Sequence, residues 1–401
     1  MKVGIIRETR ADENRTPITP VDARMIKAAY GVDVVVQKSQ RRIFSDSDYE
    51  DCGIKAVNSL EDCDVLFGVK EPSPASLLDG KHYFFFGHMD QKPPYDKELL
   101  KSCLEHRITL TDYEYIVDAK GKRLVAFGYY AGMAGMYNTI RLVGLKYGLF
   151  ELPALNFRFT QKRIFEELQK VRRIVLDMGL HILLTGKGNV SRGVEYILSL
   201  LGVEEVGVSD YLYGEKLKFQ SVYCNVGAKE LVFDTYGNYY NRERFKASPV
   251  TFSSKFYPFA TKTDVLVCGH TFSHDAPAYL DGRIVRSAEN RIRVVGDITC
   301  DIGGSVATTL RYSNHENPFY DVDKSLEEVE LFADKDNISV MAVDTLPNAL
   351  SEEASVWFSG VVYKYIFPEL MAKKSEMLDR STQIRGGCVT EKFGFLKDWR
   401  L

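Results

Sequence analysis

The sequence predicts an α/β protein of two domains, each built around a parallel β-sheet. Short apolar runs with little alternation recur along the chain, as expected of parallel strands that are covered on both faces. Polar or amphipathic connectors separate these runs, in the βα order of a parallel sheet. The chain has 401 residues, more than the roughly 250 to 300 residues at which a single core stops growing. We therefore expect two domains of similar size.

The first block of the chain is expected to contribute five strands and at least one clear helix. The strands are predicted at residues 2–7, 32–37, 63–69, 82–87 and 107–116. The helix follows the turn-like stretch RTPITP, reads PVDARMIKAAY, and is expected to end at Gly31. This alternation predicts the first parallel sheet.

A second block, about 170 residues long, repeats the pattern. Its strands are predicted at residues 181–186, 203–210, 263–269, 291–299 and 338–344. Residues 126–148, Gly-rich at the start and helix-like afterwards, suit a connecting helix that begins at a domain edge. After Asp344, Leu346 and Pro347 precede Ser351 and two glutamates, which predicts a helix with Ser351 as its N-cap.

Composition excludes several classes of partner. Lysine and arginine number 52 against 55 acidic residues, a net charge of -3 with no basic block, so nucleic acid is not expected as a partner. The apolar run near the N-terminus, Val3 to Ile6, is too short for a signal peptide or a membrane span. Seven cysteines with no CxxC pair predict reduced thiols, with no disulfide frame and no metal site. We expect a cytoplasmic protein without a membrane partner.

A glycine-containing loop in the second block predicts a dinucleotide site. HILLTGKGNVSRGVEYILSLLG (residues 181–202) is an apolar strand, a turn with Gly186 and Gly188, and a helix. In this context glycines let the backbone approach a pyrophosphate at a helix N-terminus. The spacing departs from GxGxxG, because Ser191 stands in the third place and Gly193 follows two residues later. The predicted cofactor-binding residues of this loop are Gly186, Gly188, Asn189, Val190 and Ser191.

The coenzyme that we expect depends on Asp210. The strand after this loop is predicted to end at Asp210. An acidic residue at that place can accept hydrogen bonds from the ribose hydroxyls of an adenosine and repels a 2'-phosphate. We therefore expect NAD, with NADP the less favoured alternative.

Charged residues gather where predicted strands end. Lys70 and His88 each close a strand of the first block, and Arg15 lies in the loop after its first strand. Asp297 closes a strand of the second block, and Asp301 follows in GDITCDIGGS. Ligands of open parallel sheets bind outside the carboxyl ends of strands. A lysine that is partly desolvated and close to an arginine favours its neutral amine and can act as a base, while histidine supplies a second proton carrier.

These stretches together resemble the alanine dehydrogenase and transhydrogenase alpha-subunit superfamily. VGIIRETR with RTPITP is similar to its opening, which implies that Arg15 binds a substrate carboxylate. VKEP, and the histidine that ends the next apolar run, resemble its catalytic lysine and histidine, which implies those roles for Lys70 and His88. DITCDIGGS resembles an acidic cofactor-side loop, which implies that Asp297 and Asp301 lie beside the cofactor.

Three stretches resemble one branch of that superfamily, the L-lysine-forming saccharopine dehydrogenases and lysine-ketoglutarate reductases. They are AFGYYAGMAG, TGKGNVSRG and VDTLPNALSEEAS. Arg141 sits where that branch uses an arginine near the cofactor. Glu71 is expected on the substrate side, where it could tune Lys70, or as a cap of the turn after Lys70. The aromatic-rich segment 211–260 has no clear counterpart in the branch.

The resemblance implies two Rossmann-like domains with an active-site cleft between them and hinge closure around the ligand. The first, discontinuous domain (residues 1–135 plus 349–401) would hold substrate and catalytic groups, and the second (136–348) would bind NAD. The implied reaction converts saccharopine, NAD⁺ and water to L-lysine, 2-oxoglutarate and NADH, or the reverse.

Two other functions compete with this hypothesis. The first is an alanine dehydrogenase, or another amino-acid or opine dehydrogenase, that uses the same lysine and histidine. The second is a binding or regulatory protein that keeps the fold without turnover. The expected partner is in each enzymatic case a small amino acid and oxo acid, and the sequence leaves self-association open.

Overall fold

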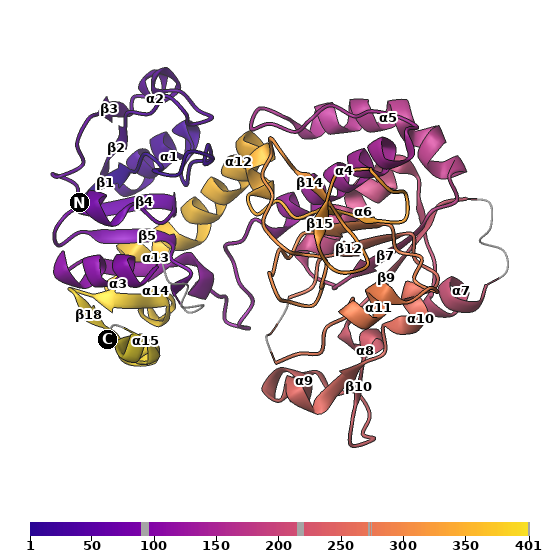
Figure 1. The fold of residues 1–401 in the computed structure, drawn as a ribbon. Coiled ribbons are helices and arrows are strands. Elements are labelled where there is room, and N and C mark those ends of the chain that lie inside the picture. Colours follow the sequence, from indigo (N-terminus) through magenta and orange to yellow (C-terminus); the bar gives the residue numbers. More distant parts are fainter. Residues whose placement is uncertain (90–95, 215–219, 272, 274, 400–401) are drawn as a thin grey trace. The chain divides into compact units, whose positions relative to one another are not determined.

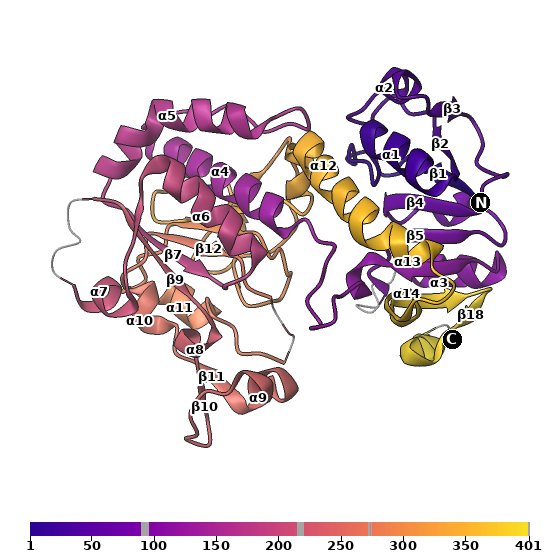
Figure 2. The same cartoon turned by 180° about the vertical axis from the view of Figure 1, so that it is seen from behind.

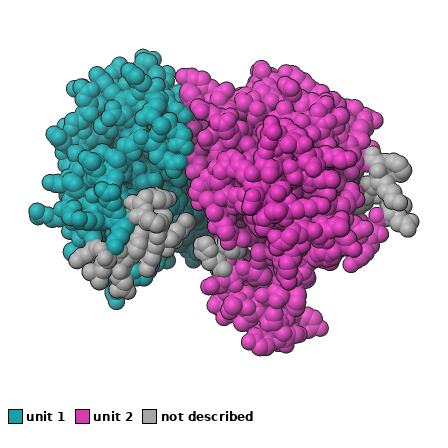
Figure 3. All heavy atoms as spheres, viewed as in Figure 1, with its two compact units in different colours: residues 1–127, 351–401 teal, residues 128–350 magenta. Residues whose placement is uncertain are grey.

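The computed structural model describes residues 1–89, 96–214, 220–271, 273 and 275–399. The chain forms two compact units. Unit 1 comprises residues 1–127 and 351–401, and unit 2 comprises residues 128–350 (Figure 3). The first unit is therefore discontinuous. The predicted boundary near Gly135 moves to Gly128, because Gly135 lies inside helix α4 (Gly128–Tyr147), which belongs wholly to unit 2.

Unit 1 is built on an eight-stranded sheet in the order β18-β17-β6-β5-β4-β1-β2-β3. The strands are β1 (Lys2–Ile5), β2 (Asp33–Gln37), β3 (Lys55–Val57), β4 (Val65–Lys70), β5 (His82–Phe86), β6 (Thr109–Asp112), β17 (Thr382–Arg385) and β18 (Cys388–Val389). Strands β1 to β6 are parallel, whereas β17 from the C-terminal segment pairs antiparallel with β6. The five predicted strands are all present, and β3, β17 and β18 are additions.

Helices cover both faces of this sheet (Figures 1 and 2). They are α1 (Pro20–Tyr30), α2 (Asp46–Asp51), α3 (Asp96–Glu105), α12 (Ser351–Val361), α13 (Phe367–Met371), α14 (Glu376–Ser381) and α15 (Phe395–Trp399). On one face, α1, α12 and α13 bury Ile26, Phe358 and Phe367 against Phe67. On the other face, α3 and α15 pack on β5 and β6. Helix α1 ends at Gly31 in the left-handed conformation, as predicted.

Unit 2 holds a second eight-stranded sheet, ordered β15-β14-β16-β13-β12-β7-β9-β8. Its strands are β7 (His181–Thr185), β8 (Glu204–Glu205), β9 (Val222–Val226), β12 (Val265–Cys268), β13 (Val294–Asp297), β14 (Phe319–Val322), β15 (Glu328–Val329) and β16 (Ile338–Met341). The neighbouring strands β16, β13, β12, β7, β9 and β8 pair in parallel. Strands β14 and β15 extend the sheet beyond β16 with antiparallel pairings. Strands β9, β14 and β15 were not predicted.

Two helical layers enclose this sheet as well (Figures 1 and 2). One is formed by α4, α5 (Gln161–Asp177) and α6 (Asn189–Leu201), and the other includes α7 (Val208–Tyr213), α8 (Ala228–Leu231), α10 (Tyr257–Ala260) and α11 (Gly282–Arg286). A small hairpin, β10 (Val232–Asp234) with β11 (Phe252–Ser254), and helix α9 (Arg242–Ala247) complete the unit. The aromatic-rich segment 211–260 thus supplies β9, the hairpin and α7 to α10; residues 215–219 of it lie outside the described residues.

All seven cysteines are free thiols, as the sequence predicted. None of the helices described is both long enough and apolar enough to cross a membrane.

Candidate active site

Lys70 and His88 meet at the carboxyl ends of two adjacent strands of unit 1. Lys70 is the last residue of β4, and His88 lies just beyond the end of β5, which pairs with β4. The Nζ atom of Lys70 is 3.3 Å from Nε2 of His88. The structure therefore brings the two predicted catalytic side chains into direct contact.

The environment of Lys70 favours its neutral amine. Burial, and then the positive charge of Arg15, lower the pKa of Lys70 from its ordinary value. Glu71 and Glu13 act in the opposite direction without reversing the shift. This is the direction expected of a lysine that takes up a proton near neutral pH.

Glu8 fixes the backbone at the end of β4. Its carboxylate accepts hydrogen bonds from the N–H groups of Val69 (2.7 Å) and Lys70 (3.0 Å). Burial and the neighbouring charge of Glu13 raise the pKa of Glu8 to about 8. The sequence analysis missed Glu8, although it lies in the loop after β1, at the same edge of the sheet.

Glu114 orients His88 from the turn that follows β6. Its Oε2 atom is 3.5 Å from Nδ1 of His88, and its Oε1 atom is 2.9 Å from Nη2 of Arg123. Burial alone would raise the pKa of Glu114, but the hydrogen bond with His88 and the charge of Arg123 lower it to about 2. One imidazole nitrogen of His88 thus faces a carboxylate while the other faces Lys70. Glu114 was also missed, although it follows β6 as His88 follows β5.

Arg15 is buried and already paired. Its Nε and Nη2 atoms bind the two carboxylate oxygens of Glu13 at 2.8 and 2.5 Å, and its guanidinium lies 4.1 Å from the ring centre of Phe127. Burial alone would raise the pKa of Glu13, but Arg15 lowers it. Glu13 occupies the Nε–Nη2 side of the guanidinium, so a substrate carboxylate would be bound through the remaining N–H groups of Nη1 and Nη2.

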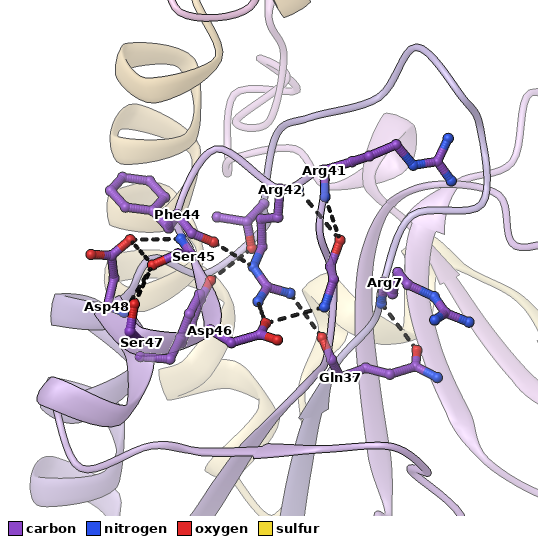
Figure 4. Close-up of polar contacts among 12 residues, drawn as sticks. Arg7, Gln37, Arg41, Arg42, Phe44, Ser45, Asp46, Ser47 and Asp48 are labelled. Atoms are coloured by element: carbon purple, nitrogen blue, oxygen red, sulfur yellow. Dashed lines mark hydrogen bonds and ion pairs between the residues drawn. The ribbon is translucent and has the colours of Figure 1, made fainter.

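The backbone just before Arg15 is held by the loop that follows β2. The N–H of Ile43 donates to the carbonyl of Asn14 at 2.8 Å. Within this loop the buried Arg42 donates to the last carbonyl of β2 at 2.9 Å and to the Asp46 carboxylate at 2.6 Å (Figure 4). The Arg15 side of the site is therefore fixed by a polar network between β2 and α2.

Glu71 offers a buried acceptor next to Lys70. Its Oε2 atom is buried and has no hydrogen-bond partner among the described residues. Burying a carboxylate oxygen without a donor costs free energy. This favours the substrate-side position of Glu71 over its alternative as a cap of the turn, since a cap would satisfy its oxygens with backbone N–H groups.

In unit 2 the glycine loop has the geometry of a phosphate cradle. Gly186 follows β7 with a φ of 98°, and a Cβ atom there would lie 2.6 Å from the carbonyl oxygen of Gly269. Gly188 precedes the first residue of α6, and a Cβ atom there would meet open space. Ser191 donates from Oγ to the Gly186 carbonyl at 2.7 Å, which fixes the turn. A dinucleotide phosphate fits this loop, because backbone approach is open at Gly188.

The irregular glycine spacing has a packing cause. A Cβ atom on Gly193 would lie 2.0 Å from the carbonyl oxygen of Tyr129, so this glycine serves the contact of α6 with α4. The side chain of Val190 packs at the same contact, 3.3 Å from a Cβ atom placed on Gly128. Of the two predicted binding residues here, only the exposed Asn189 presents its side chain to solvent.

A cavity of about 500 Å³ opens in front of the glycine loop. It lies at the carboxyl ends of β7, β9 and β12, the three central strands of this part of the sheet. Its walls carry positive charge. The lining residues are Gly186, Lys187, Gly188, Gly227, Ala228, Lys229, Glu230, Leu231, Tyr240, Arg242, Phe245, Gly269, His270, Thr271 and Tyr279. The acidic member, Glu230, accepts a hydrogen bond from the N–H of Gly227 at 2.9 Å.

His270 lines this cavity in its neutral form. Nδ1 lies 2.6 Å from the hydroxyl of Thr185, and Nε2 lies 2.6 Å from the hydroxyl of Ser305. Burial lowers the pKa of His270 to about 4. It therefore shapes the cavity as an uncharged group.

The prediction for Asp210 rested on a strand over residues 203–210, of which the structure forms only a short first part. Strand β8 covers only Glu204–Glu205, and Asp210 lies exposed on α7. Moreover, β8 is the edge strand, and β9 separates it from β7. Asp210 is not among the residues that line the cavity. The reason for expecting Asp210 to bind the adenosine ribose is thereby removed.

Three further predicted cofactor residues also lie apart from this cavity. Arg141 donates from Nε to the carbonyl of Leu152 at 3.1 Å, inside the packing around α4. The buried Asp297 accepts hydrogen bonds from the hydroxyls of Thr299 and Thr309, both at 2.5 Å. Asp301 follows in the same loop and is not a lining residue. The side chains of Arg141 and Asp297 are thus engaged in contacts within unit 2, and none of the three residues lines this cavity. Their cofactor-binding roles stay predictions.

Comparison with known proteins places the first part of the chain in a described family. Residues 4–134 match the family "Alanine dehydrogenase/PNT, N-terminal domain". Among solved structures, an L-alanine dehydrogenase matches 100% of both chains with a TM-score of 0.66 at 16% identity. A transhydrogenase from Sinorhizobium meliloti covers 97% of this chain and 99% of its own, with a TM-score of 0.60 at 14% identity. These structural likenesses show the fold.

Curated relatives extend the match along the chain. The alpha-aminoadipic semialdehyde synthase of Arabidopsis thaliana is 30% identical over 97% of this chain, and that of Mus musculus, named as mitochondrial, is 26% identical over 98%. This chain spans only 40% and 47% of their lengths. A saccharopine dehydrogenase [NAD(+), L-lysine-forming] of Schizosaccharomyces pombe is 24% identical, with 92% of this chain and 91% of the relative covered.

Proposed function

We propose that this chain, which belongs to the saccharopine dehydrogenase branch of the alanine dehydrogenase/transhydrogenase superfamily, is a nicotinamide-dependent oxidoreductase acting on a C–N bond. The proposed reaction converts saccharopine, NAD(P)⁺ and water to L-lysine, 2-oxoglutarate and NAD(P)H, or the reverse. The observation that carries the proposal is the 3.3 Å contact between Lys70 and His88. It places two proton carriers at the strand ends where ligands of parallel sheets bind.

The proposed reaction has two proton tasks. A secondary amine must be neutral before its carbon can lose a hydride, and the imine that results is hydrolysed by an activated water. Lys70, with a pKa lowered by burial and by Arg15, and His88, held by Glu114, supply the two carriers. A nicotinamide coenzyme would supply the hydride acceptor when bound.

The charged groups around the pair suit a substrate that carries both amine and carboxylate groups. Glu71 presents a buried, unpaired carboxylate oxygen to an ammonium group. Arg15 can bind a substrate carboxylate through its remaining Nη1 and Nη2 N–H groups, since Glu13 holds the Nε side. Both residues belong to unit 1, as does the Lys70–His88 pair.

For the coenzyme we now favour NADP over the NAD expected from the sequence. Lys187, Lys229 and Arg242 line the cavity in front of the glycine loop, whereas Asp210 does not. We propose that the adenosine ribose lies in this cavity, where these cations would favour a 2'-phosphate. The name of the fission yeast relative specifies NAD(+), so the two coenzymes must be compared directly.

The test is coenzyme oxidation by the purified protein with 2-oxoglutarate plus L-lysine, run in parallel with pyruvate plus ammonia. NADPH and NADH are each supplied in both assays. Turnover only with the first substrate pair supports the proposal. Turnover only with pyruvate and ammonia would assign the chain to alanine dehydrogenase activity, and no turnover with either would contradict both. The cytoplasmic location and the small-molecule partners expected from the sequence stay predictions.

A further inference from the structure

Two buried polar side chains close to His88 have no role in the chemistry proposed above. Asp112, the last residue of β6, and Gln383 of β17 have no exposed surface. A methyl group placed on Gly87 would lie 3.1 Å from Oδ2 of Asp112 and 3.7 Å from Oε1 of Gln383. The two side chains therefore approach the same side of the residue that precedes His88.

Asp112 holds the backbone on both sides of the His88–Glu114 contact, at Gly87, which precedes His88, and at Glu114 itself. Its Oδ2 atom accepts a hydrogen bond from the N–H of Gly87 at 3.1 Å, and its Oδ1 atom accepts one from the N–H of Glu114 at 2.8 Å. His88 itself has a φ of 49°. A residue other than glycine seldom adopts this conformation unless its surroundings hold it there.

Gln383 reaches this place because its strand is irregular. The register between β17 and β6 shifts between Thr382 and Ile384, so Gln383 is the bulged residue. Bulges commonly redirect a side chain beside an active site. Both Nε2 and Oε1 of Gln383 are buried without a hydrogen-bond partner among the described residues. An amide in this state costs free energy and needs an explanation.

We propose that Asp112 is a positioning residue that sets the His88 imidazole between Lys70 and Glu114. Gln383, which packs beside Gly87 without a hydrogen bond to Asp112, limits the movement of the Asp112 side chain. This inference rests on the proposed function, in which His88 carries a proton. The C-terminal segment thereby contributes to the site without touching the reacting groups.

The charges around Asp112 predict how its substitution should change the pH dependence of the reaction rate. The titratable groups that face it are Glu114 and His88, and Tyr113 is also close. Burial, and further the charge of Glu114, raise the pKa of Asp112 to about 7, against the effect of its N–H donors and of His88. Above about pH 7, where Asp112 is ionised, Asp112→Asn removes a negative charge beside His88 and so disfavours the protonated imidazole. The limb of the pH–rate profile that depends on His88 should therefore move to lower pH.

The first experiment is Asp112→Asn, with Asp323→Asn as the matched control. Asp323 also accepts hydrogen bonds from two backbone N–H groups, of Ser325 and Glu327, but in unit 2. We expect Asp112→Asn to lower kcat by roughly 10- to 100-fold while KM changes by less than about threefold, because misplacing a reacting group acts mainly on the chemical step. Asp323→Asn should leave kcat and the pH profile unchanged. A wild-type kcat and pH profile in Asp112→Asn would overturn the proposal.

The second experiment is Gln383→Leu, which separates a positioning role from a structural one. Leucine removes two buried polar atoms that lack partners, so the thermal midpoint should rise or stay the same. We expect kcat to fall nonetheless, by roughly three- to tenfold, with the same acid shift of the pH profile. A more stable protein with unchanged kcat would show that Gln383 does not position His88.

A measurement that needs no turnover tests this proposal independently of the proposed function. The imidazole resonances of the full chain can be followed by NMR as a function of pH, with His88 assigned from its absence in His88→Asn. Asp112→Asn should move the His88 titration to lower pH even if no substrate pair is turned over. An unmoved His88 titration would reject the positioning role whatever the reaction proves to be.

Discussion

The two units differ in how their strand ends come together. In unit 1, β4, β5 and β6 follow one another along the chain and also lie side by side, so Lys70, His88 and Glu114 meet. In unit 2, the strand that follows β7 along the chain is the edge strand β8, and the unpredicted β9 lies between them. Local patterns locate the end of a strand, but only the order of strands in the sheet says which ends share a site.

The largest effect should come from breaking the unit 1 arrangement at Lys70. Lys70→Met removes the amine that contacts His88, and we expect kcat to fall by about 10²- to 10⁴-fold, the usual contribution of a proton-transfer group. Coenzyme affinity should stay within a few-fold, because the glycine loop belongs to unit 2. Steady-state kinetics and coenzyme titration measure both.

Lys101→Met is the control, since Lys101 is an exposed lysine on α3 paired with Glu105. It should leave kcat unchanged. Wild-type activity in Lys70→Met would remove the catalytic assignment.

The next effect concerns the stability that Glu114 gives to unit 1. Its pKa is lowered from 4.5 to about 2, which corresponds to on the order of 3 kcal/mol. Because the folded-state pKa is depressed, this stability is present above pH 4.5 and is lost as the pH falls toward 2. Glu114→Gln should therefore unfold at lower urea concentration at pH 7 and depend less on pH between 5 and 3.

The exposed Glu105→Gln serves as the control, with wild-type unfolding expected at every pH. If Glu114→Gln kept the full acid sensitivity of the wild type, the contact with His88 and Arg123 would not stabilise the fold as described.

The third test contrasts two glycines of the unit 2 loop. Gly188→Val adds a side chain in open space at the start of α6, so folding should be unaffected while dinucleotide affinity falls at least about tenfold. Gly186→Val meets the backbone of Gly269 at a φ of 98°, so its thermal midpoint should fall. Isothermal titration and thermal unfolding distinguish the two; unchanged affinity in Gly188→Val would refute the loop assignment.

The smallest expected effect is on coenzyme preference. It tests whether this preference depends on Arg242, which lines the cavity, or on Asp210, as the sequence predicted. Arg242→Ala should reduce the preference for NADPH over NADH roughly fivefold, as expected for about 1 kcal/mol from an exposed cation. Asp210→Ala should leave that ratio unchanged, because Asp210 does not line the cavity. The opposite pattern, a change with Asp210 and none with Arg242, would show that the expectation drawn from the sequence was right. The ratio of kcat/KM values for the two coenzymes is the quantity to measure.

Much of the fold could be predicted because both sheets are built from apolar parallel strands. All five predicted strands of unit 1 are present, as are the connecting helix α4 and the return of the chain into the first unit. Strand β9 was missed because its sequence, VYCNV, lies in a segment whose aromatic residues obscured the pattern.

The site was predicted in part for a related reason. Lys70 and His88 could be found because each ends an apolar run. Glu8 was missed although it directly follows a predicted strand. Glu114 was missed because the predicted strand 107–116 extends past it, whereas β6 ends at Asp112. Glu13 shows a different limit: an arginine that looks free in the sequence can be neutralised by a carboxylate two residues away.

The C-terminal segment also determines the order in which the units can form during synthesis. Strand β17 pairs with β6, and the hydroxyls of Ser355 and Ser359 accept hydrogen bonds from the backbone of Thr16 and Thr19. On the ribosome, residues 1–127 must wait for these partners until more than 220 later residues have been translated. Unit 2, whose residues are continuous, can fold meanwhile. Residues 1–127 are thus completed only after the later segment 351–401 has been made, and the β6 edge stays without its β17 partner until then.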